Sequence, residues 1–251
     1  MSHSDQEKAP PIAAKRSGFE TTDWSLVLAA SSTQSLPLLN RLCSAYWKPV
    51  YTYLRCGGLS VHESEDVTQD FFADMLRREW LENISRERGR FRTFLLVYLR
   101  NFLANHRRTE QAQKRGGSVE TIPLDILAAE NDLAPLIDKG VDSAQAYEMT
   151  WASTLLQAAL KRLQDEFSGE KMERFLKLRP FLTQSPSQGD YQRLAEEIGI
   201  NKGQVAVVIH RYSKRFQELI RAEVAATLVD RGQVAEELRH LLVSVAENSR
   251  A

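Results

Sequence analysis

Three aspartates recur at every fourth position in one segment of the chain, Asp66, Asp70 and Asp74. On an α-helix this spacing places their carboxylates on one face, with Gln69 beside them. Carboxylates in such a row are candidates for metal ligands or for acid–base groups. A stripe of this kind is more often a solvated face, so we expect a surface on which another protein docks, and no metal site.

A second segment combines positive charge with aromatic rings. Between residues 86 and 115 there are nine basic residues and two acidic ones. Such a cluster neutralises phosphates in a salt-sensitive and sequence-independent way, and exposed aromatic rings stack on unpaired bases. The candidate nucleic-acid contacts are Trp80, Arg88, Arg90, Phe91, Tyr98, Arg100, Asn101, Arg107 and Arg108. Phe94 and Phe102 are expected in the core, whereas the three aromatic candidates fit either a core or a stacking position.

A third pattern, from Tyr191 to Val205, fits two helices joined by a tight turn. Ala195 is small enough for close approach of two backbones, and Gly199 can adopt the positive φ that ends a helix. Asn201 is a good N-cap for the next helix, and Gln204 stands where a capping box needs it. The pattern is that of a helix-turn-helix, although an ordinary helical hairpin is the alternative.

The second helix of this pattern has distinct inner and outer faces. Its expected buried stripe consists of Val205, Val208, Ile209, Tyr212 and Phe216. Base contacts in a major groove are expected from Lys202, Gln204 and Arg211, with Val207 on the same outer face. Phosphate contacts are expected from Lys214, Arg215 and Arg221. The run Ala206–Val208 offers no long polar side chain, which argues for weak base recognition.

These segments lie on helices, because nearly every long stretch has helical rather than alternating periodicity. We expect an all-α protein of two small helical domains joined by a flexible linker. The expected boundaries are a disordered tail at 1–20, a first domain at 21–115, a linker at 116–146 with at most short helical pieces, a helix-turn-helix domain at 147–226 and an amphipathic C-terminal helix within 227–251. The linker is inferred from Gly116, Gly117, Pro123, Pro135 and Gly140.

Two further details of the helices are expected. Pro49 should kink or break the helix predicted over residues 36–56. In the second domain a single helix is predicted over residues 169–183.

The overall composition excludes several classes of protein. The 251 residues carry 33 basic and 33 acidic side chains, so overall charge does not attract nucleic acid and local clusters must do so. No apolar run reaches the length of a membrane span, and the polar N-terminus lacks a signal peptide. Two cysteines, Cys43 and Cys56, are too few for a disulfide framework. We therefore expect a cytoplasmic protein that does not associate with membranes.

Three motifs resemble the N-terminal domain of bacterial RNA polymerase sigma factors of the extracytoplasmic-function type: Glu65–Phe72, Gly89–Leu95 and Arg100–Arg108. The block that ends in the helix-turn-helix is similar to the C-terminal domain of that family. The resemblance covers most of residues 24–225. The segment after about Asp230 has no counterpart in the minimal two-domain type.

The resemblance implies a mechanism without covalent chemistry or cofactor. The helix with Asp66, Gln69, Asp70 and Asp74 would dock on core RNA polymerase, at the clamp helices of the β′ subunit, and the β subunit would also be a partner. Arg100 and Asn101 would engage the melted non-template strand of promoter DNA. The helix-turn-helix would contact the upstream promoter element. An anti-sigma factor or another regulator is a further partner that the family suggests.

Two other classes remain open. A stand-alone DNA-binding regulator would need only the helix-turn-helix, and would bind duplex DNA through residues 147–225 without polymerase. A sigma-like interaction protein would bind polymerase or a regulator without opening promoters. An enzyme is not expected, because no nucleophile–base pair, phosphate-binding loop or metal cluster stands out in the sequence.

Overall fold

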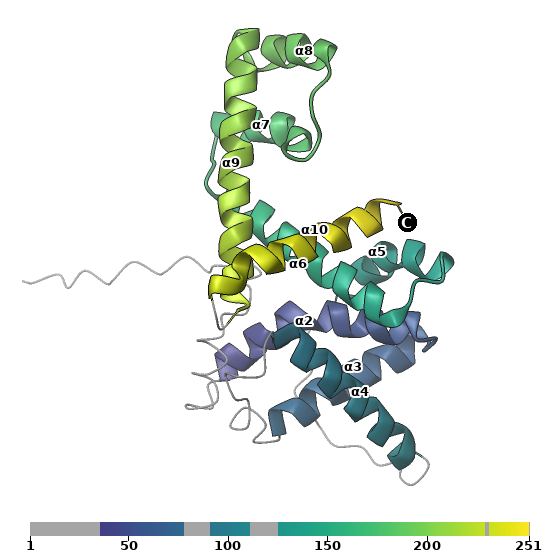
Figure 1. Cartoon of the computed structure of the whole chain (residues 1–251). Helices are drawn as coiled ribbons and strands as arrows, with labels where there is room; N and C mark the ends of the chain where they lie inside the picture. Colours follow the sequence, from purple (N-terminus) through teal and green to yellow (C-terminus); the bar gives the residue numbers. More distant parts are fainter. Residues whose placement is uncertain (1–35, 78–90, 111–124, 229–230, 251) are drawn as a thin grey trace, which may run out of the picture.

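The computed structural model describes residues 36–77, 91–110, 125–228 and 231–250. Within these ranges the chain forms nine α-helices and two short 3₁₀ helices, and it forms no strand (Figure 1). The prediction of an all-helical protein is therefore confirmed for the described residues. The expected disordered tail at 1–20 lies outside them.

Three helices form the lower part of the molecule in Figure 1: α2 (Leu36–Cys56), α3 (Val61–Arg77) and α4 (Phe91–Glu110). Helix α2 is continuous through Pro49, so of the two expected effects, a kink or a break, the break does not occur. Pro49 is buried within the core, and this packing offsets the backbone hydrogen bond that a proline cannot donate. After α2 the chain turns at Gly58, whose φ of 91° is in the glycine-favouring region.

Residues expected to belong to a linker instead form the whole of the 13-residue helix α5 (Ile126–Asp138) and the start of α6 (Ser143–Asp165). Asp125 caps α5 by accepting a hydrogen bond from the Ala128 amide at 3.1 Å. One side of α5 buries Ala129, Leu133 and Leu136, and the helix packs on α2. Capping and burial thus outweigh the helix-breaking tendency of Pro135, which lies inside α5.

The upper part of Figure 1 contains α7 (Glu170–Leu178), α8 (Gln188–Ile198) and the long α9 (Lys202–Ala226). The single helix predicted over residues 169–183 is wrong in its second half. There the chain forms a 3₁₀ helix, η3 (Arg179–Leu182), with Pro180 in its first turn. Pro180 cannot donate the amide hydrogen bond that would continue α7.

Buried side chains gather in two clusters. The first cluster contains residues of the four helices α2, α3, α4 and α5. It also includes the first half of α6, the end of α9 and α10 (Val234–Arg250). The second joins the rest of α6 with α7, α8 and most of α9. Leu156 on α6 and Ile220 on α9 pack against both clusters, so these two helices connect them.

A helix is present where the sequence predicts one near the C-terminus. Helix α10 packs against α6 and α9 and follows the 3₁₀ turn η4 (Arg231–Gln233) (Figure 1). Leu241 is buried, and Val234 and Leu238 are partly buried, which is the expected apolar side of an amphipathic helix. No helix in the described ranges has the length and apolar character needed to cross a membrane.

Candidate protein-docking and nucleic-acid surfaces

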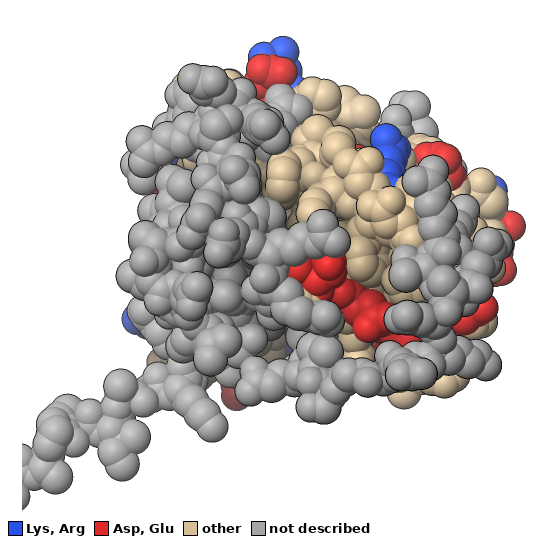
Figure 2. All heavy atoms as spheres, turned by 90° about the horizontal axis from the view of Figure 1, so that it is seen from below, with Lys and Arg blue, Asp and Glu red and all other residues tan. Residues whose placement is uncertain are grey.

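The aspartate row on α3 is exposed at two of its three positions. The side chains of Asp66 and Asp70 are 65 % and 57 % exposed. Asp74 is half-buried and accepts a hydrogen bond from the Tyr98 hydroxyl at 2.7 Å, and Gln69 is half-buried. Figure 2 looks from below onto the side of α3 and α4, and acidic side chains form a band on this face. Asp66 and Asp70 are therefore the carboxylates available to a partner.

Two histidines lie beside this row. His62 Nδ1 is 3.8 Å from Asp66 Oδ2 on the same helix, and His106 Nε2 of α4 is 3.4 Å from Asp70 Oδ2. The first relation follows from the four-residue spacing, whereas the second depends on how α4 crosses α3. In the described part of the chain no three His, Cys, Asp or Glu side chains are grouped so that they could hold a metal ion.

Helix α4 exposes fewer nucleic-acid candidates than its sequence suggests. Arg100 and Asn101 are exposed. Phe91 is fully buried, with its ring 5.0 Å from that of Tyr46, so the stacking role considered for Phe91 does not fit this structure. Tyr98 is half-buried, and its ring stacks on Phe94 at 6.2 Å. Phe91 and Tyr98 therefore pack against other side chains of the protein, because the apolar side of α4 faces α2 and α3.

Arg92 belongs to the basic segment by sequence but is 5 % exposed. It forms ion pairs with Glu148 and Glu237, and its guanidinium lies 4.4 Å from the ring centroid of Trp151. Burial lowers the pKa of Arg92, but the hydrogen bond to Glu237 and the charges of both glutamates outweigh this and raise it. Its charge is used inside the protein and is not offered to a phosphate.

The remaining candidates of the basic segment divide into two groups. Trp80, Arg88 and Arg90 lie outside the described residues. Arg107 and Arg108 lie on the last turns of α4, and the structure does not describe their side chains. Arg100 borders a hollow of about 240 Å³ between the end of α2, α4 and the start of α6. Arg100 and Asn101 are therefore the nucleic-acid candidates on α4 whose exposure is established.

The helix-turn-helix has the local geometry that the sequence predicts. Gly199 has φ 67° and ψ 37°, and its amide donates to the Ala195 carbonyl. Asn201 and Gln204 form a capping box, with the Gln204 amide donating to Asn201 Oδ1 at 2.9 Å and the Asn201 amide donating to Gln204 Oε1 at 3.2 Å. The predicted turn and cap are confirmed. The Gln204 side chain thus holds the cap through Oε1, and its Nε2 group is the part left to donate to a base.

The two faces of α9 are also as predicted. All five residues of the expected stripe are buried, and Lys202, Val207 and Arg211 are exposed. No acidic residue occurs from Ile198 to Gln217. This half of α9 therefore presents a positively charged outer face.

Arg215 differs from the other cations on α9. Its guanidinium donates to both carboxylate oxygens of Glu166, at 2.7 to 3.1 Å, and to Glu218 at 3.0 Å. The hydrogen bonds to Glu166 and then Glu218 raise the pKa of Arg215. Within the described ranges Lys202, Arg211 and Lys214 form no ion pair. They are better phosphate ligands than Arg215, whose charge is already compensated.

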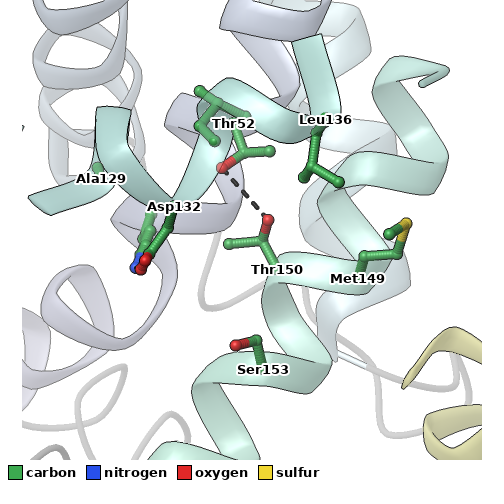
Figure 3. A pocket seen from close by; sticks show the side chains of 9 residues that line it. Thr52, Ala129, Asp132, Leu136, Met149, Thr150 and Ser153 are labelled. Carbon is green, nitrogen blue, oxygen red and sulfur yellow. Dashed lines mark hydrogen bonds and ion pairs between the residues drawn. The ribbon is translucent and has the colours of Figure 1, made fainter. Parts of the chain in front are cut away.

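A small cavity lies between α2, α5 and α6 (Figure 3). Its volume is about 50 Å³, and the Thr150 hydroxyl donates to the Thr52 hydroxyl at 3.3 Å on one wall. Lys48 and Asp132, 2.5 Å apart, lie at the same cavity. A space of this size with several polar groups suits a few water molecules and no larger ligand.

Comparison with known proteins adds no relative: no family model, no curated protein and no solved structure matches the chain.

Proposed function

We propose that the protein is a sigma factor, which binds core RNA polymerase and directs it to promoters, where it helps to melt the DNA. The observation that carries the proposal is the presence in one chain of two surfaces of opposite charge. One is the exposed carboxylate pair Asp66 and Asp70 on α3. The other is the outer face of α9 from Lys202 to Gln217, which carries no acidic residue and begins at the Asn201 cap of the helix-turn-helix.

The two surfaces suit different partners. A row of carboxylates repels DNA, so α3 would bind protein, and basic side chains of the polymerase clamp would pair with it. The helix-turn-helix suits the major groove of duplex DNA, with Lys202, Arg211 and Lys214 near phosphates. In Figure 1 the α8–α9 turn lies at the top and α3 at the bottom. This separation leaves both surfaces accessible at once.

Helix α4 would supply the contacts to melted DNA. Arg100 and Asn101 are exposed on it, and Arg107 and Arg108 follow along the same helix. These residues would hold the backbone of the displaced strand, because a basic groove binds single strands without a sequence requirement. Polymerase would carry out the synthesis.

The test is capture of core RNA polymerase by the full-length chain, with wild type compared with the double variant Asp66→Ala, Asp70→Ala. We expect the double variant to lose binding and to keep the wild-type unfolding midpoint, because both side chains are exposed. The matched control is Asp138→Ala, Asp165→Ala, which removes two exposed carboxylates near the ends of α5 and α6. There a negative charge opposes the helix dipole, so its removal costs little stability.

The helix-turn-helix also favours a second candidate, a regulator that binds duplex DNA without polymerase. In that case wild type would not retain polymerase, and the full chain alone would select a duplex sequence. Equal retention of polymerase by wild type and by the Asp66, Asp70 double variant would instead refute the docking role of α3.

A further inference from the structure

The outer face of α9 carries a solvent-exposed apolar side chain at its centre. Val207 is 65 % exposed, and its neighbour Ala206 is exposed as well. Gln204, which comes one turn earlier, is engaged in the capping box. Around Val207 this face therefore presents methyl groups, and the next exposed polar side chain along the helix is His210.

Positive charges surround this apolar spot. Arg211 and Lys214 stand four and seven residues after Val207, on the same side of the helix, and Lys202 lies at its start. All three are exposed and, within the described ranges, form no ion pair. A polyanion with an apolar group on its surface complements this face, because the cations would neutralise phosphates on either side of the methyl contact.

In the major groove of DNA the C5-methyl group of thymine is the apolar group among hydrogen-bonding base edges. We propose that Val207 contacts the thymine methyl group and makes the helix-turn-helix prefer a thymine at one position of its site. This inference rests on the DNA-binding part of the proposed function, and it adds the residue and the base that set specificity. Recognition by a methyl contact needs no long polar side chain. The lack of such side chains in Ala206–Val208 is therefore compatible with base recognition by this helix.

The experiment begins with selection of duplexes by the full-length chain bound to core polymerase, and by the full-length chain alone. Each thymine of the selected duplex is then replaced, one at a time, by deoxyuridine, which lacks only the C5-methyl group. We expect one replacement to weaken binding by wild type about fourfold, the ratio that corresponds to burial of one methyl group. We expect Val207→Ala to bind the thymine duplex several-fold more weakly, and to be insensitive to the same replacement.

The matched control is Val243→Ala on α10, since Val243 is 56 % exposed and lies outside the helix-turn-helix. This variant should bind like wild type and keep the sensitivity to deoxyuridine. Because Val207 is exposed, Val207→Ala should fold normally, and its unfolding midpoint should equal that of wild type.

Three outcomes overturn the inference, and they differ in their consequences. Additive effects of Val207→Ala and deoxyuridine at every position refute the methyl contact and leave the proposed function intact. Weaker binding of polymerase by Val207→Ala in the absence of DNA assigns the valine to a protein contact. Failure of both preparations to select any duplex refutes DNA recognition by the helix-turn-helix, and with it this part of the proposed function.

Discussion

Glu237 of α10 accepts a hydrogen bond from Arg92 of α4 at 2.7 Å, although the two residues are 145 positions apart in the sequence. The Glu237 side chain is 1 % exposed, and that of Arg92 is 6 % exposed. Glu148 of α6 pairs with the same guanidinium, which also lies over the ring of Trp151. The C-terminal helix is thereby attached to the first hydrophobic cluster by a buried charge as well as by Leu241.

Removal of this carboxylate should destabilise the protein. Glu237→Ala leaves a buried guanidinium with one of its two partners, and loss of one member of a buried ion pair costs about 3 kcal/mol. Urea unfolding at pH 7 measures the change. Glu173→Ala is the control, because Glu173 is an exposed glutamate on α7, away from α10. Equal unfolding free energies for the two variants would show that the pair does not hold α10 in place.

Glu130 should make the attachment of α5 sensitive to acid. Arg55 donates two hydrogen bonds to its carboxylate, at 2.8 and 2.9 Å, and Tyr51 donates a third at 2.7 Å. The hydrogen bond from Arg55 is the largest cause, opposed by burial, of a pKa for Glu130 below the ordinary value of 4.5. A carboxyl group whose pKa is lowered by folding stabilises the protein at every pH above the ordinary pKa. That stability is lost as the pH falls from the ordinary pKa through the lowered pKa of the folded protein.

Glu130→Gln should therefore lower the free energy of unfolding by about 2 kcal/mol at pH 7, the size of a charged hydrogen bond. The difference from wild type should shrink as the pH falls below 4.5. Denaturant titrations at pH 7 and pH 3.5 test this, with Asp138→Asn as a control at the exposed end of the same helix. A difference that stays constant with pH would mean that the carboxylate charge is not what holds α5.

Arg100→Ala should reduce promoter opening by the complex with core polymerase, because Arg100 is expected to hold the displaced strand. The slope of the logarithm of affinity against the logarithm of salt concentration should fall by about one unit, for one lost phosphate contact. Binding of single-stranded DNA in a salt series measures the slope. Lys139→Ala removes an exposed cation after α5 and should leave the slope unchanged. An unaltered slope for Arg100→Ala would make Arg100 an ordinary surface residue.

Gly199→Ala should destabilise the helix-turn-helix by about 1 kcal/mol, because an L-residue with a side chain is strained at a φ of 67°. A Cβ at this position would meet no atom within 4 Å, so backbone strain and not a clash is the cause. Gly189→Ala is the matched control, since its Cβ would also be unobstructed and its φ is not positive. That substitution should be neutral or stabilising. Thermal unfolding of both alanine variants tests this prediction. A third variant, Gly199→Asn, should be tolerated. Equal melting temperatures for the two alanine variants would contradict the prediction.

Local features of the fold were predictable from the sequence. The turn at Gly199, the Asn201 cap and the buried stripe of α9 depend on residues within a few positions of each other, and a helix repeats its faces every three to four residues. The acidic row on α3 follows from the same periodicity. Helix α5 was missed because Pro135 and nearby glycines favoured a linker, whereas the Asp125 cap and burial against α2 stabilise a helix.

The sequence by itself determined that the protein is helical, where the helix-turn-helix turns, and which side of each long helix is polar. Only the tertiary structure decided which charges remain available to a partner. Arg92 and Arg215 look like surface cations in the sequence, yet one is buried against Glu237 and the other is paired with Glu166. The physical reason is that periodicity fixes which side chains share a face, whereas the partner of a charge depends on which distant helix packs against that face.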